Sequence, residues 1–184
     1  MTKRLYLIGI VIIVLLVGQC ILSVLIGPSR PLTFSLEIIQ ILGITMILTL
    51  ILNALVAMKY YSEKKLWLPF VGSILVGISY PVLSAQRFFA TSIDLDPEWT
   101  EFSFDLVIYS SIFYGAALLI SKARLKRWLM VYGLAILFSW SLVLLLIYEP
   151  GMVHQFAVFI EYFVEIIPLF LLLQYLAELK DIKN

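Results

Sequence analysis

Six apolar runs, each long enough to cross a lipid bilayer as a helix, constrain this chain more than any other feature. They span residues 5–26, 36–58, 66–85, 102–121, 128–148 and 155–177. A helix rises ~1.5 Å per residue, so ~20 apolar residues cross the hydrocarbon. In addition, 62% of the residues are hydrophobic, against roughly 45–50% in soluble domains. We therefore expect an all-α, polytopic integral membrane protein, in which residues 1–184 form a single transmembrane domain, a six-transmembrane-helix bundle.

The basic residues predict how the bundle is oriented. Six spans place both termini on one side, and eleven of the thirteen Lys and Arg residues fall on that side. The opposite side holds only Arg30 and Arg87. Loops rich in Lys and Arg remain in the cytoplasm. We therefore expect a multi-pass protein of the cell membrane with N- and C-termini cytoplasmic, and the compact loops are typical of a bacterial inner (plasma) membrane.

The sixth apolar run carries two carboxylates, Glu161 and Glu165, in its body. An ionisable residue at the centre of a span costs roughly 2.5 to 3.5 kcal/mol on insertion scales, so we expect this face to turn into the bundle. Residues four apart share one helix face. Pro168 also leaves the carbonyl of Val164 without its helical donor. These oxygens suit a proton or a hard cation; alternatively, protonated glutamates act only as structural hydrogen-bonding groups between helices.

Two local patterns concern the third and fourth helices. Ser73 and Gly77 lie four residues apart on one face of the third helix, which predicts close approach of a neighbouring helix. The sequence Asp96, Pro97, Glu98 is typical of a helix N-terminus, just ahead of the fourth apolar run.

Three tyrosines complete the predicted binding site. Tyr80, Tyr109 and Tyr114 occur in the third and fourth helices, and they would offer hydroxyl groups and aromatic faces to a cation. We expect them to line a polar pocket between helices three, four and six, together with Glu161 and Glu165. The ligand or ion would be a proton, a metal cation or a cationic group of a small solute.

The chain shows no catalytic or cofactor motif. Its single cysteine, Cys20, cannot form an intramolecular disulfide, and its single histidine, His154, excludes a His-x-x-His zinc site. The formal net charge of +1 gives no bias toward nucleic acid. We therefore expect no cofactor and no nucleic-acid partner, and the lipid bilayer is the expected surrounding.

The leading functional hypothesis is a small membrane protein that binds or transports a small solute or cation through its intramembrane carboxylates. A second hypothesis is a non-catalytic accessory protein, an immunity, assembly or sensory partner of another membrane protein. An intramembrane enzyme with Glu161 and Glu165 as an acid/base pair is a third hypothesis, and a weaker one, because no nucleophile or metal-ligand motif accompanies the pair.

Overall fold

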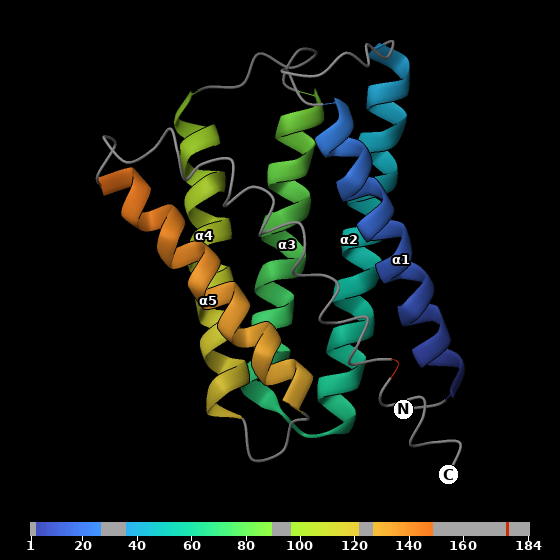
Figure 1. The fold of residues 1–184 in the computed structure, drawn as a ribbon, viewed down its shortest axis with the longest axis vertical. Helices are drawn as coiled ribbons and strands as arrows, with labels where there is room; N and C mark the ends of the chain where they lie inside the picture. The colour runs from blue at the N-terminus through green and yellow to red at the C-terminus, as the bar shows by residue number, and fades with distance from the viewer. Residues whose placement is uncertain (1–2, 27–35, 90–96, 122–126, 149–175, 177–184) are drawn as a thin grey trace.

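The computed structural model of the chain describes residues 3–26, 36–89, 97–121, 127–148 and 176. Every element in these residues is an α-helix, which confirms the all-α prediction for this part of the chain. The helices are α1 (Lys3–Ile26), α2 (Leu36–Glu63), α3 (Trp67–Phe89), α4 (Pro97–Ile120) and α5 (Arg127–Tyr148). Figure 1 shows them running up and down in turn, and each packs against its neighbour in the sequence.

Three of these helices contain a segment long and apolar enough to cross a membrane, which supports a multi-pass membrane protein. The segments are Gln40–Glu63, Trp67–Gln86 and Glu101–Ile120. Shorter apolar segments, Leu7–Gln19 and Leu129–Leu145, lie in α1 and α5. The sixth predicted helix, residues 155–177, falls outside the described residues except for one position.

Large apolar side chains are exposed along α1 and α2, as expected for helices in contact with lipid. On α2 they recur at helical spacing at Ile41, Ile44, Leu48 and Leu55. Such a stripe would be unfavourable in water but costs nothing against lipid tails. The exposed face of α2 therefore agrees with its length in indicating a membrane environment.

The helix ends differ from the predicted ranges by a few residues. α4 begins at Pro97, which confirms the helix-start pattern at residues 96–98 and places the start ahead of residue 102. α3 continues through Pro81 to Phe89 rather than ending at residue 85. Neighbouring helices and side chains can satisfy the carbonyl that a proline frees in a membrane helix, so the residue need not end it.

A tight turn joins α2 to α3 and fixes their antiparallel pairing. The N–H of Leu66 donates to the carbonyl of Tyr61 (2.9 Å), and the N–H of Lys65 donates to that of Ser62 (3.1 Å). These two bonds form a Schellman motif, whose penultimate residue must adopt a left-handed backbone. Lys65 does so with φ of 54°, and the buried side chains of Leu66 and Tyr61 complete the motif.

Small residues let α2 and α3 approach closely, as the sequence predicts. A Cβ atom added at Gly77 would lie 2.5 Å from the Cβ of Ala54 on α2. A second close approach joins α4 to α5, where a Cβ added at Gly115 would lie 3.0 Å from the carbonyl oxygen of Gly133. Both contacts bring helix backbones together, and helix association in membranes depends on such packing.

We expect Gly77→Ala to destabilise the protein by about 1–3 kcal/mol, because two rigid Cβ atoms would overlap. The double variant Gly77→Ala/Ala54→Gly restores the space and should recover most of the loss. Gly18→Ala is the control, since nothing lies within 4 Å of a Cβ added there. Unfolding of detergent-solubilised protein with denaturant measures all three. Equal losses from Gly77→Ala and Gly18→Ala would show that the α2–α3 contact is not close.

A second prediction concerns the turn. Lys65→Gly should leave stability unchanged or raise it by up to ~1 kcal/mol, because glycine adopts the left-handed backbone without steric cost. Lys65→Val should lower stability, since a β-branched side chain tolerates positive φ poorly. The same denaturant titration compares the two variants. A gain from valine would contradict the left-handed turn.

Candidate functional site

Polar side chains form a seam inside the otherwise apolar bundle. Four of them lie on α4 and are buried: Ser103, Ser110, Ser111 and Tyr114. Residues 103, 110 and 114 follow the seven- and four-residue spacing of a single helix face. This face of α4 looks toward α3, so the polar groups meet partners between helices rather than lipid.

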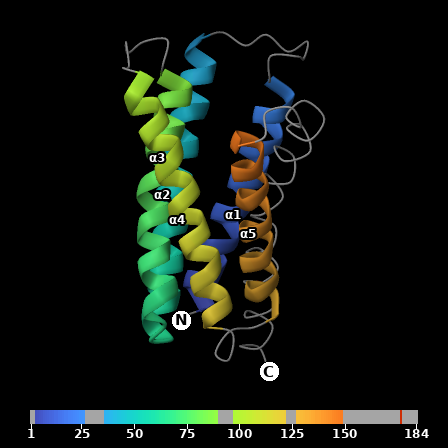
Figure 2. The same cartoon turned by 90° about the vertical axis from the view of Figure 1, so that its left-hand side faces the viewer.

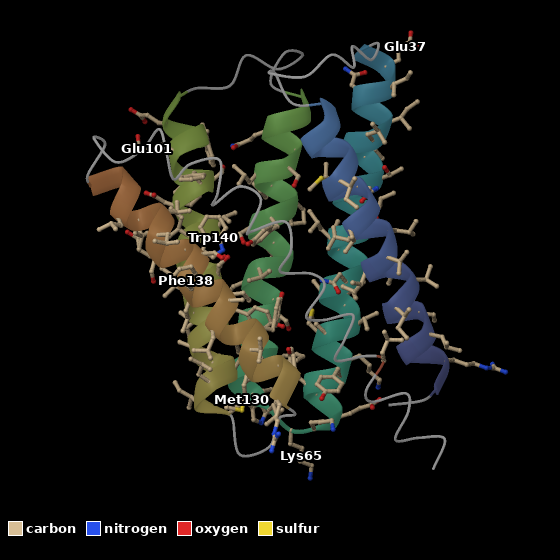
Figure 3. All side chains as sticks on the ribbon, in the orientation of Figure 1. Glu37, Lys65, Glu101, Met130, Phe138 and Trp140 are labelled. Atoms are coloured by element: carbon tan, nitrogen blue, oxygen red, sulfur yellow. The ribbon has the colours of Figure 1, made fainter. Side chains whose placement is uncertain are left out.

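At the centre of the seam, the hydroxyl of Tyr80 on α3 receives two hydrogen bonds. Ser111 Oγ of α4 donates to it at 3.2 Å, and Trp140 Nε1 of α5 donates to it at 3.2 Å. One side chain from each of three helices therefore meets at a single oxygen. Trp140 is only 5% exposed and is labelled on α5 in Figure 3. We call Tyr80, Ser111 and Trp140 the tyrosine node.

The hydrogen-bonding capacity of the node has a chemical consequence. A tyrosine hydroxyl offers two acceptor positions and one proton. Ser111 and Trp140 both donate to the oxygen of Tyr80, so neither of these two bonds uses the proton of Tyr80. In an apolar interior a buried hydroxyl or indole N–H strongly favours a polar partner over an apolar one. The node thus lets three side chains from three helices satisfy polar groups at one place in the bundle.

Hydroxyl pairs flank the node along the seam. Ser79 and Ser110 bring their Oγ atoms within 2.7 Å between α3 and α4. Toward the α2–α3 turn, the hydroxyl of Tyr61 lies 2.7 Å from that of Tyr114. In each pair one hydroxyl donates to the other, which reduces the cost of burying both groups between helices.

The opposite end of the seam holds an amide with a fixed orientation. Gln86 Nε2 donates to the backbone carbonyl of Trp99 (3.1 Å) and to Ser103 Oγ (2.6 Å), and Ser103 Oγ donates to the same carbonyl (2.7 Å). Because both partners of Nε2 act as acceptors, the amide cannot be turned over. Its Oε1 atom is buried and accepts no hydrogen bond from the described residues.

Aromatic rings surround the node. The ring of Trp140 meets the rings of Tyr80 and Phe104 edge to face, with centroids 6.2 and 6.4 Å away. Edge-to-face contacts of this kind favour a fixed arrangement of the rings. The hydroxyl of Tyr80 is therefore held in position by packing as well as by hydrogen bonds.

The structure separates the three predicted site tyrosines. Tyr80 lies at the node, whereas Tyr114 is 3% exposed and bonds to Tyr61 nearer the α2–α3 turn. Tyr109 is 62% exposed on the outer side of α4. Glu161 and Glu165 lie outside the described residues. Ligand binding by these five residues therefore stays a prediction.

The predicted site did not include the other residues of the node and of the hydroxyl pairs, which are Trp140, Ser111, Tyr61, Ser79 and Ser110. A tryptophan in the middle of an apolar helix is a usable signal, because its buried indole N–H needs an acceptor. Within the described residues, no group of three or more His, Cys, Asp or Glu side chains could hold a metal ion. No family model, no curated protein and no solved structure matches the chain.

We expect Tyr80→Phe to destabilise the protein by about 1–3 kcal/mol, because it leaves the hydroxyl of Ser111 and the indole N–H of Trp140 without their acceptor. Tyr109→Phe is the matched control: it removes the same hydroxyl from an exposed ring and should change stability by less than ~0.5 kcal/mol. Thermal unfolding in detergent compares them. Equal effects would contradict a buried, shared Tyr80 hydroxyl.

Proposed function

We propose that the protein binds or transports a small cationic solute, or a proton, through a polar site in the membrane that joins the tyrosine node to Glu161 and Glu165. The observation that supports this proposal is the Tyr80 hydroxyl. It lies inside the bundle, where side chains of α3, α4 and α5 meet at one oxygen, and a hydroxyl can donate a hydrogen bond as well as accept one. A carboxylate is the strongest acceptor that the apolar runs of the sequence offer to such a donor.

The proposal includes a sixth span. Residues 155–177 would form the last transmembrane helix and bring Glu161 and Glu165 to the membrane interior. A carboxylate there needs a hydrogen-bond donor or a cation to remain charged. Tyr80 would supply the donor, and the solute or proton would supply the positive charge.

Binding would then exchange partners at the carboxylates. Without a cation, one proton would be held on or between the two glutamates, since two close carboxylates in a low dielectric do not both ionise. A cationic solute would displace that proton, while the Tyr80 hydroxyl continues to donate to the carboxylate. Proton release on binding is the chemical basis for coupling solute movement to a proton gradient.

The orientation proposed for this bundle has both termini in the cytoplasm. It is supported by charge, because exposed basic side chains gather at the end of the bundle where α1 begins, while Glu37, Glu98 and Glu101 lie at the other end. Loops that carry Lys and Arg are retained in the cytoplasm.

The test compares thermal stability of the parent protein, Glu165→Gln and Tyr80→Phe in nanodiscs, between about pH 5 and pH 9. Each protein is measured with and without a panel of inorganic and organic cations. A bound ligand stabilises by about 2.7 kcal/mol at 100 times its Kd. We expect a ligand- or pH-dependent rise in the parent that is lost in Glu165→Gln and weakened in Tyr80→Phe.

Glu101→Gln is the control, since it removes an exposed carboxylate near the start of α4. It should retain the full response of the parent. An identical response in the parent and in Glu165→Gln would contradict the carboxylate site. The accessory-protein hypothesis would then be preferred, and it predicts stabilisation by a membrane protein partner instead.

A further inference from the structure

The charged side chains of the bundle are separated toward its two ends. The starts of α1 and α5 and the turn between α2 and α3 lie together at the lower end in both views (Figures 1 and 2). The exposed basic side chains described there are Arg4, Lys59, Lys64, Lys65 and Arg127. Glu63 is the one acidic side chain among the described residues at this end. We call this group of side chains the basic end.

The local structure of the turn determines which cations face outward. Lys59 Nζ lies 3.5 Å from Glu63 Oε1, so this lysine is matched by a carboxylate. The left-handed backbone at Lys65 ends α2 and brings the chain back toward α3 within a few residues. Lys64 Nζ lies 5.2 Å from the centre of the Tyr60 ring. Lys64 and Lys65 thus stand at the tip of the turn.

The residues that follow the turn indicate its depth relative to the membrane. Trp67 is 74% exposed and Leu68 is 44% exposed, at the first positions of α3. An exposed tryptophan at the end of a transmembrane helix favours the level of the lipid head groups. Lys65 precedes Trp67 by two residues and Lys64 by three, so with the tryptophan at that level we expect their ammonium groups to lie near the lipid phosphates.

We propose that the basic end binds the head groups of anionic phospholipids in the adjoining leaflet. Five cations against one carboxylate give this end a clear positive excess, and in the orientation proposed above it would face the cytoplasmic leaflet, where anionic lipid gathers. Each Lys or Arg close to an anionic bilayer surface raises affinity about fivefold. The proposal uses neither Glu161 nor Glu165, so it stands or fails separately from the proposed function.

The test measures lipid preference directly. The protein is reconstituted into phosphatidylcholine vesicles that contain spin-labelled phosphatidylglycerol or spin-labelled phosphatidylcholine, and electron paramagnetic resonance gives the fraction of each lipid immobilised by the protein. We expect phosphatidylglycerol to be preferred several-fold in low salt. The preference should fall as sodium chloride is raised, because salt screens exposed charges.

Two triple variants distinguish charge from shape. Lys64→Gln/Lys65→Asn/Arg127→Gln removes three cations, and asparagine tolerates the left-handed backbone at position 65; it should lose most of the preference. Lys64→Arg/Lys65→Arg/Arg127→Lys keeps every charge and should retain it. A parent protein without preference, or an unchanged preference in the neutral variant, would overturn the proposal.

Inorganic phosphate identifies the source of the bound anion. At constant ionic strength, millimolar phosphate should leave the lipid preference unchanged, because the affinity arises from a surface of many head groups. Loss of the preference in phosphate would indicate a site for a small free anion and would overturn the assignment to lipid. The salt titration of the parent protein gives an answer even if a variant fails to fold.

Discussion

The hydrocarbon core of a bilayer contains no water, so a polar group buried in a membrane bundle is stabilised by a partner inside the bundle. Backbone groups do so within the helices. Many hydroxyl side chains do so by turning back onto their own helix: Thr49 donates to the carbonyl of Thr45 (2.7 Å), and Ser139 donates to that of Ala135 (2.8 Å). These residues are polar in sequence but add little polar surface between helices.

The polar groups that do reach across helices therefore stand out. Tyr80, Ser111 and Trp140 join three helices through one oxygen, which accepts a hydrogen bond from each of the other two side chains. The neighbouring Tyr61–Tyr114 pair joins two helices, because one of its hydroxyls donates to the other across 2.7 Å. The node therefore differs from the pair in the number of helices that it joins.

The all-α class of the described residues could be predicted from the sequence, because apolar runs of this length are typical of membrane helices. Which tyrosines are buried depends also on where each one lies around its helix. Tyr109 and Tyr114 are five residues apart, which places them about 140° apart around a helix, so helical geometry already separates the exposed ring from the buried one. Trp140 is different: its partner on α3 follows from how α5 crosses the bundle, which no local pattern contains. The positive φ at Lys65 likewise reflects a turn that sequence did not specify.

The contacts around Tyr80 also bear on how α5 is held in the bundle. Trp140 of α5 donates to the Tyr80 oxygen of α3, and its ring meets Phe104 of α4 edge to face. The close contact between Gly115 and Gly133 brings the backbones of α4 and α5 together independently of these side chains. The apolar segment of α5 is shorter than those of α2, α3 and α4. Because α5 is held by a hydrogen bond, by ring packing and by backbone contact, its place in the bundle depends on its neighbours as well as on its own hydrophobic length.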